Sequence, residues 1–120
     1  MSVEHKARAL KFKCSDWRFE EMIDADTKSR GLNGNSDEIS WPEASKNFDK
    51  VNTAAILLLQ LHDPDQALIY EHQDCGAYGE NNSEETHRTN AQKLADSLKT
   101  AKPKLEIEIL FVTSEGIKEL

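Results

Sequence analysis

Two short motifs in this chain carry side chains of the kinds that bind metal ions. Residues 14–18 read Cys-Ser-Asp-Trp-Arg, and residues 72–76 read His-Gln-Asp-Cys-Gly. The two thiols and the imidazole are ligand types that zinc prefers. Three protein ligands, rather than four, are typical of a catalytic zinc site, because the fourth position stays open for water. The motifs therefore predict a zinc centre held by Cys14, His72 and Cys75.

The spacing within the second motif suits a single ion. His72 and Cys75 are separated by two residues, so one turn can aim both side chains at the same point, and Gly76 gives the backbone the freedom to make that turn. A zinc ion held in this way could bind water and lower its pKa. Because two thiolates cancel the formal charge of Zn²⁺, we expect that water to be less acidic than in a three-histidine site.

Asp16 and Arg18 lie just beyond the first cysteine and are candidates for the catalytic groups. Arg18 would keep Asp16 ionised and oriented, and the ionised carboxylate could accept a hydrogen bond from zinc-bound hydroxide. Released from Arg18, the same carboxylate could instead reach the metal as a fourth ligand and close the site. The sequence leaves both arrangements open.

The predicted elements place the two motifs at the ends of strands. A strand over 9–14 ends at Cys14, and a strand over 66–71 delivers His72. Further strands are predicted over 38–41 and 105–112, and helices over 17–29, 47–61 and 83–101. This alternation predicts a single α/β domain over residues 1–120, with a mostly parallel four- to five-stranded sheet flanked by helices. In such sheets ligands bind beyond the carboxyl ends of the strands, where both motifs lie.

Composition narrows the range of partners. The formal net charge of −7 argues against binding to nucleic acid or to an anionic membrane surface, since both need clustered Lys and Arg. No apolar run approaches the roughly 18 residues of a membrane span. Residues 1–10 lack the apolar segment of a secretion signal, so we expect a cytoplasmic protein. In a reducing cytoplasm its two cysteines are candidates for metal binding or catalysis before a disulfide.

Together, the two motifs resemble the signatures of the β-class carbonic anhydrases, Cys-x-Asp-x-Arg and His-x-x-Cys-Gly. The resemblance extends to the order of strands and helices over most of the chain, as in a small, divergent member. It implies zinc bound by Cys14, His72 and Cys75, with Asp16 and Arg18 as the catalytic dyad. It also implies a zinc lyase that hydrates CO₂ reversibly to bicarbonate through zinc-bound hydroxide, assembled as a homodimer or a higher homo-oligomer.

Three other functions stay open. The same zinc chemistry could act on CS₂ or COS, which are linear like CO₂. A non-catalytic zinc-binding domain would keep the fourth metal position permanently filled. A redox protein would use Cys14 and Cys75 as a disulfide, but it would leave His72, Asp16 and Arg18 without a role.

Four further residues could contribute to the site or to the packing around it. We expect Trp17 to pack against the fold, and His87 to be a solvated residue of the last predicted helix, with proton shuttling as the alternative. Tyr78 could donate a hydrogen bond near the metal or cover a pocket. Asp74, between two predicted ligands, could orient one of them or cap the turn.

Overall fold

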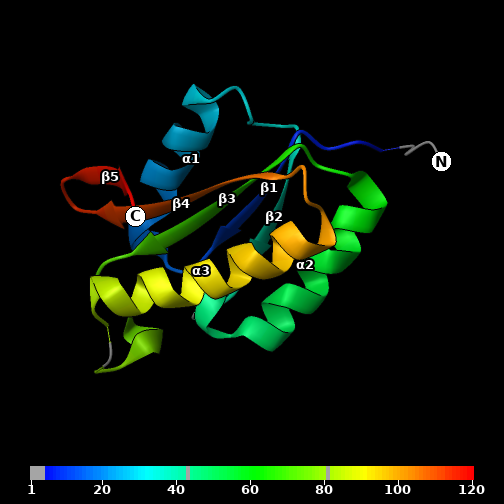
Figure 1. Ribbon diagram of the computed structural model, residues 1–120. Coiled ribbons are helices and arrows are strands. Elements are labelled where there is room, and N and C mark those ends of the chain that lie inside the picture. Colours follow the sequence, from blue (N-terminus) through cyan, green and yellow to red (C-terminus); the bar gives the residue numbers. More distant parts are fainter. Residues whose placement is uncertain (1–4, 43, 81) are drawn as a thin grey trace.

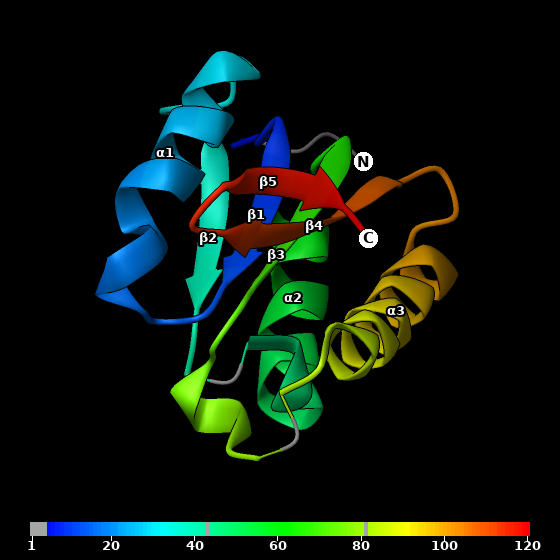
Figure 2. The same ribbon diagram turned by 90° about the vertical axis from the view of Figure 1, so that its left-hand side faces the viewer.

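A five-stranded sheet with helices on both faces forms the framework of the protein (Figures 1 and 2). The computed structural model describes residues 5–42, 44–80 and 82–120. The strands are β1 (Ala9–Lys13), β2 (Ser36–Ser40), β3 (Gln66–His72), β4 (Glu106–Thr113) and β5 (Gly116–Glu119). The helices are α1 (Glu20–Ser29), α2 (Phe48–His62) and α3 (Glu84–Ala101), with short 3₁₀ helices η1 (Trp17–Phe19), η2 (Ala44–Lys46) and η3 (Gly76–Tyr78).

The strand order is β2-β1-β3-β4-β5, and only the last pair is antiparallel. This confirms the predicted α/β domain with a mostly parallel sheet. The β5 strand was not predicted from the sequence, because four residues are too few to show a clear alternation of apolar and polar side chains. It forms a tight hairpin with β4, in which Gly116 has a φ of 145°.

The three helices lie close to their predicted positions. The first turn of the segment predicted as a helix from residue 17 is the 3₁₀ helix η1, so α1 begins at Glu20. Asp63 ends α2 in the left-handed conformation, with a φ of 43°. Ser83 caps α3, since its Oγ accepts a hydrogen bond from the Thr86 N–H at 3.1 Å. No helix in the described part of the chain has the length and apolar character needed to cross a membrane.

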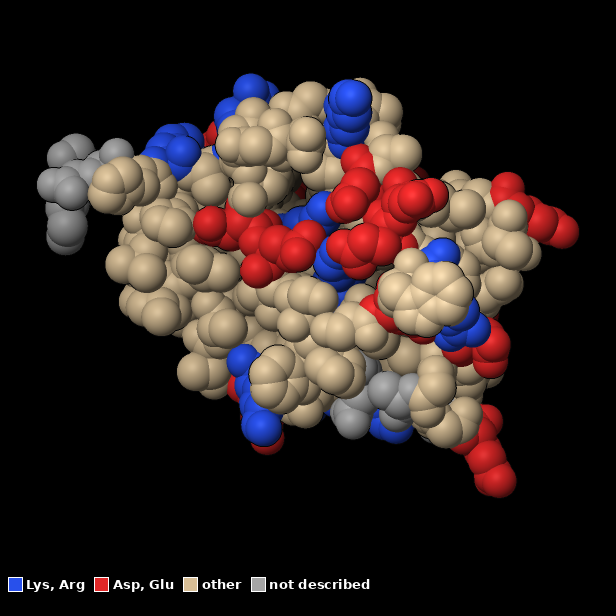
Figure 3. Space-filling view, turned by 180° about the vertical axis from the view of Figure 1, so that it is seen from behind, with Lys and Arg blue, Asp and Glu red and all other residues tan. Residues whose placement is uncertain are grey.

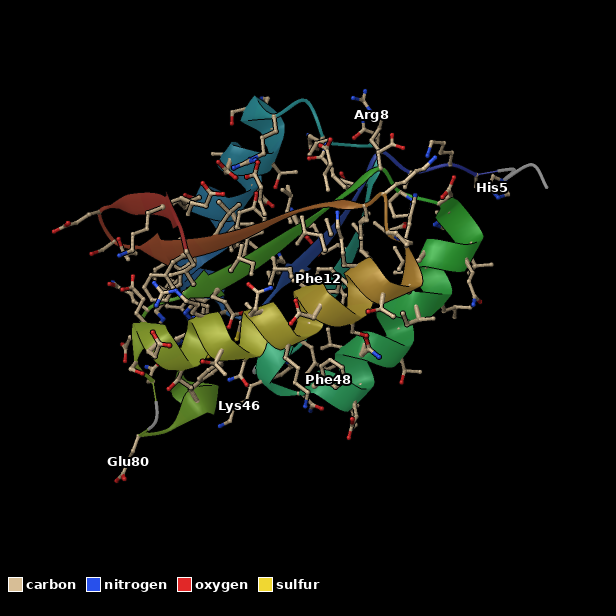
Figure 4. The ribbon with its side chains drawn as sticks, in the orientation of Figure 1. His5, Arg8, Phe12, Lys46, Phe48 and Glu80 are labelled. Atoms are coloured by element: carbon tan, nitrogen blue, oxygen red, sulfur yellow. The ribbon has the colours of Figure 1, made fainter. Side chains whose placement is uncertain are left out.

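The sheet separates two hydrophobic cores, because α1 covers one face and α2 and α3 cover the other (Figures 1 and 2). Phe12 lies in the larger core, between the sheet and the helix pair (Figure 4). The buried members of that core are Leu10, Phe12, Val51, Ala55, Leu59, Ala67, Ile69, Ala91, Leu94, Ala95, Leu98 and Leu105. The core under α1 consists of Ala9, Phe19, Ile23, Leu32, Leu68, Tyr70, Leu110 and Val112.

Ion pairs allow the interior strand β1 to carry two lysines. Acidic side chains gather around basic ones on the face seen in Figure 3. Lys11 and Lys13 are both buried, and their Nζ atoms lie 3.3 and 3.4 Å from the same Glu38 oxygen on β2. Lys13 also pairs with Glu20, the first residue of α1. Because buried charges are tolerated only when paired, these contacts fix α1 and β2 against β1.

The larger core is expected to dominate the stability of the fold. We expect Leu94→Ala, at a fully buried position on α3, to lower the free energy of unfolding by about 2–5 kcal/mol. The control is Leu57→Ala on α2, where the side chain is 54% exposed and the expected change is about 0.5 kcal/mol. Urea unfolding curves of the two variants measure the difference. Equal losses would contradict this assignment of the core.

Candidate metal centre

The two motifs meet at the carboxyl ends of neighbouring strands. Cys14 directly follows β1, and His72 is the last residue of β3. These strands are parallel and paired in register, with Phe12 opposite Ile69. The chain leaves β1 toward β2 on one side, whereas β3 lies on the other, so their carboxyl ends lie at a topological switch point, where α/β proteins typically bind ligands.

Cys14, His72 and Cys75 form a compact set of donor atoms. One donor atom from each residue lies within 4.8 Å of the other two, and no other group of three or more such residues occurs in the described part of the chain. All three are buried, with exposed fractions of 7%, 2% and 2%. The Cys14 Sγ to Cys75 Sγ distance is 3.6 Å. That distance is far above the roughly 2.05 Å of a disulfide. It is close to the roughly 3.8 Å expected for two thiolates on one tetrahedral zinc ion.

His72 is oriented as a metal ligand would be. Its Nδ1 lies 2.8 Å from the Gln73 carbonyl oxygen, to which it can donate a hydrogen bond. That bond favours the tautomer whose Nε2 carries a free lone pair. Nε2 is buried and makes no hydrogen bond to a nitrogen or oxygen atom of the described residues, and the side chain of Cys75 interacts with the ring. Phe19 stacks on the ring at 4.8 Å between centroids and holds its plane. A metal ion shared with Cys75 would take up the lone pair of this nitrogen.

Asp16 and Arg18 form a tight pair beside the donor set. Arg18 donates from Nε to Asp16 Oδ1 at 3.1 Å and from Nη2 to Oδ2 at 2.7 Å, and its backbone N–H also donates to Oδ1 at 3.0 Å. These hydrogen bonds from Arg18 lower the pKa of Asp16 to about 2 and raise that of Arg18. The carboxylate therefore stays ionised far below neutral pH. Asp16 Oδ2 lies 3.7 Å from His72 Nε2, which places a negative charge at the edge of the donor set.

Arg18 also connects the first motif to the second. Its Nη1 donates to Asp74 Oδ2 at 3.0 Å, and its Nη2 donates to the Asp74 carbonyl oxygen at 2.7 Å. Asp74 has a φ of 51°, a conformation that non-glycine residues seldom adopt. Asp74 therefore accepts hydrogen bonds from Arg18 through both its side chain and its backbone. The guanidinium group of Arg18 thus links the two motifs through hydrogen bonds.

Two expectations about neighbouring residues were wrong. Trp17 does not pack against the fold, since its side chain is 86% exposed. The reason is that η1 turns Phe19, rather than Trp17, inward against His72. His87 is buried rather than solvated, because its ring stacks on that of Tyr78 and meets the ring of Phe111 edge to face.

Glu71 is a buried residue at this end of the sheet that was not singled out from the sequence. Its side chain is 1% exposed and accepts hydrogen bonds from Ser45, Tyr78 and His87. Tyr78 therefore bonds to a carboxylate next to a predicted ligand. A signal existed, since a carboxylate within a strand that is covered on both faces must have partners inside the protein.

Comparisons with known proteins agree with this fold. No protein-family model matches the chain. An uncharacterized protein of Rickettsia conorii is 28% identical over 134 residues, an alignment that covers 96% of this chain and 72% of that protein. The structure is similar to that of the β-carbonic anhydrase CafA of the fungal pathogen Aspergillus fumigatus, with a TM-score of 0.57 and 17% sequence identity. That match covers 97% of this chain and 76% of the fungal chain, and at this identity it shows a shared fold.

Proposed function

We propose that this chain is a zinc enzyme of the β-carbonic anhydrase type that hydrates CO₂ reversibly to bicarbonate. The observation that carries the proposal is the buried cluster of Cys14, His72 and Cys75 with the ionised Asp16 at its edge. The similar fold of a known β-carbonic anhydrase supports it. Residues 1–120 would then form one zinc domain.

Each part of the site has a distinct role in this proposal. Cys14, His72 and Cys75 would hold the ion, and zinc bound there would supply a Lewis acid that activates water for attack on CO₂. Arg18 holds the Asp16 carboxylate in place through two side-chain hydrogen bonds. Phe19 covers one face of the His72 ring and keeps bulk water away from it.

Asp16 would orient the attacking water rather than store its proton. Hydration of CO₂ gives bicarbonate and a proton, and a group that stores this proton needs a pKa near the working pH. The hydrogen bonds from Arg18 hold the pKa of Asp16 at about 2, so its carboxylate is a weak base. Asp16 Oδ2 would therefore accept a hydrogen bond from the attacking water, and the proton would leave to solvent.

Stopped-flow CO₂ hydration on zinc-loaded protein near pH 8.5 tests the proposal. We expect turnover that is lost when a chelator strips the zinc and returns when zinc is added back. Because two thiolates reduce the positive charge at the metal, we expect the rate to rise from pH 6 to pH 9. The stripped protein serves as the control in every assay. Absence of turnover from the zinc-loaded protein throughout this range would refute the proposed reaction.

One observation favours a second candidate, a zinc-stabilised domain without turnover. Asp16 Oδ2 is 3.7 Å from His72 Nε2, so the carboxylate could take the fourth metal position if it left Arg18. This candidate requires tight zinc binding, loss of the fold on chelation and no hydration activity. The same stopped-flow and chelation experiments separate it from the enzyme.

A further inference from the structure

A buried hydrogen-bond cluster centres on Glu71, the residue before His72. Glu71 Oε1 accepts from Ser45 Oγ at 2.9 Å, from Tyr78 Oη at 2.6 Å and from His87 Nδ1 at 3.0 Å. All four side chains are buried. They come from β3, η2, η3 and α3, so one carboxylate oxygen connects four separate elements.

Further contacts hold Tyr78 in this cluster. Its ring stacks on that of His87 at 3.9 Å between centroids, and His87 Nε2 lies 2.8 Å from Asn82 Oδ1. Lys46 lies in η2 at the end of the molecule where α3 begins (Figure 4). Its Nζ donates to the Tyr78 carbonyl oxygen at 3.4 Å. Tyr78 is therefore fixed at both its ring and its backbone.

The cluster is connected to the metal centre through one short turn. Cys75 precedes η3, and its carbonyl oxygen accepts a hydrogen bond from the Tyr78 N–H at 3.0 Å. Glu71 and His72 are consecutive on β3 and point to opposite faces of the sheet. The bond between Tyr78 and Glu71 therefore ties the turn that carries one predicted ligand to the strand that carries another.

We propose that Glu71, acting through Tyr78, is a positioning residue that sets where Cys75 lies relative to His72. This inference rests on the proposed zinc site. It adds that Glu71 and Tyr78, which do not bind the ion themselves, affect how tightly zinc is bound. Stability alone explains the cluster poorly, because a buried carboxylate is costly and apolar side chains of similar volume often stabilise a core as well. Moreover, Glu71 Oε2 is buried with no hydrogen-bond partner among the described residues.

The test compares Tyr78→Phe with a closely matched control, Tyr70→Phe. Both hydroxyls are buried and donate to a carboxylate at 2.6 Å, Tyr78 to Glu71 and Tyr70 to Asp26. Tyr70, however, packs in the core under α1, away from the Cys75 turn. We expect both variants to lower the thermal unfolding midpoint of the zinc-free protein. Only Tyr78→Phe should weaken zinc binding, by about 10-fold or more in competition with a chelator.

The absorption spectrum of the cobalt(II)-substituted protein is a second measurement, and a general loss of stability would not change it. We expect the thiolate-to-cobalt charge-transfer absorption to change in Tyr78→Phe and to stay as in the wild type in Tyr70→Phe. If Tyr78→Phe does not fold, Ser45→Ala removes another donor from the same Glu71 oxygen and should change zinc affinity in the same direction.

The outcomes distinguish this inference from the proposed function. Wild-type zinc affinity and an unchanged cobalt spectrum in Tyr78→Phe would overturn the positioning role while leaving the zinc site in place. Equal losses of affinity in Tyr78→Phe and Tyr70→Phe would also overturn it, since the effect would then be general. A wild-type protein that binds zinc no better than Cys14→Ser would instead refute the proposed function.

Discussion

Replacing Cys14 with serine is expected to remove both bound zinc and CO₂ hydration. Cys14 is the only donor that the first motif contributes to the cluster, and a serine hydroxyl is a much poorer zinc ligand than a thiolate. His72 and Cys75 alone would leave two protein ligands. We expect the zinc content after dialysis to fall close to zero and the hydration rate to return to the uncatalysed value.

The neighbouring residue provides the control. Ser15→Ala removes only a hydrogen bond to Ser40 at the surface, and we expect it to keep both zinc and turnover. If Cys14→Ser kept zinc with wild-type turnover, the predicted ligand set would be wrong. If it lost zinc while the wild type showed no turnover, the zinc-stabilised domain would be favoured.

Asp16→Asn is expected to keep zinc and lose about 100-fold or more in turnover. The amide preserves the shape of the side chain but removes the negative charge that Arg18 holds beside His72. The asparagine NH₂ group would also face either the Arg18 guanidinium or the attacking water, where the aspartate has an acceptor oxygen. Zinc content and the hydration rate, measured on the same preparation, separate the loss of the metal from the loss of catalysis.

Asp74→Asn is the matched control for Asp16→Asn. Asp74 is the other carboxylate on Arg18, but its side chain is 81% exposed and its carbonyl oxygen remains to accept from Nη2. Exposed ion pairs contribute little, so we expect turnover within a few-fold of the wild type. Wild-type turnover in Asp16→Asn would contradict the role of the dyad. A loss of zinc from that variant would make Asp16 a group that maintains the metal site.

The residues of the candidate site could be found from the sequence because residues of metal-binding types occur where predicted strands end. Cys14 and His72 each end a predicted strand, and parallel strands present their carboxyl ends at one edge of a sheet. What the sequence could not provide is which strands are neighbours. The 3.6 Å between the two sulfurs depends on β1 and β3 lying side by side, which is a property of the whole fold.

The misjudged residues have physical explanations. His87 shares one helical face with Ala91, Leu94 and Leu98, so the period of α3 already indicated burial, although histidine is more often exposed. Glu71 gave a weaker signal, because its partners come from η2, η3 and α3, which only the tertiary structure brings together. Trp17 was misjudged because large aromatic residues usually pack, whereas η1 is too short to bury two of them.

Because β1 and β3 are neighbours, we expect the chain to fold before it binds a metal ion. In an unfolded chain, an ion that held Cys14 and Cys75 together would close a loop of about 60 residues, at an entropic cost of roughly 4 kcal/mol. When the parallel sheet folds, it brings the two cysteines together, so this entropy is lost during folding rather than on metal binding. An ion at this site would thus act as a cross-link between distant parts of the chain, and it would bind the native state far more tightly than the unfolded one.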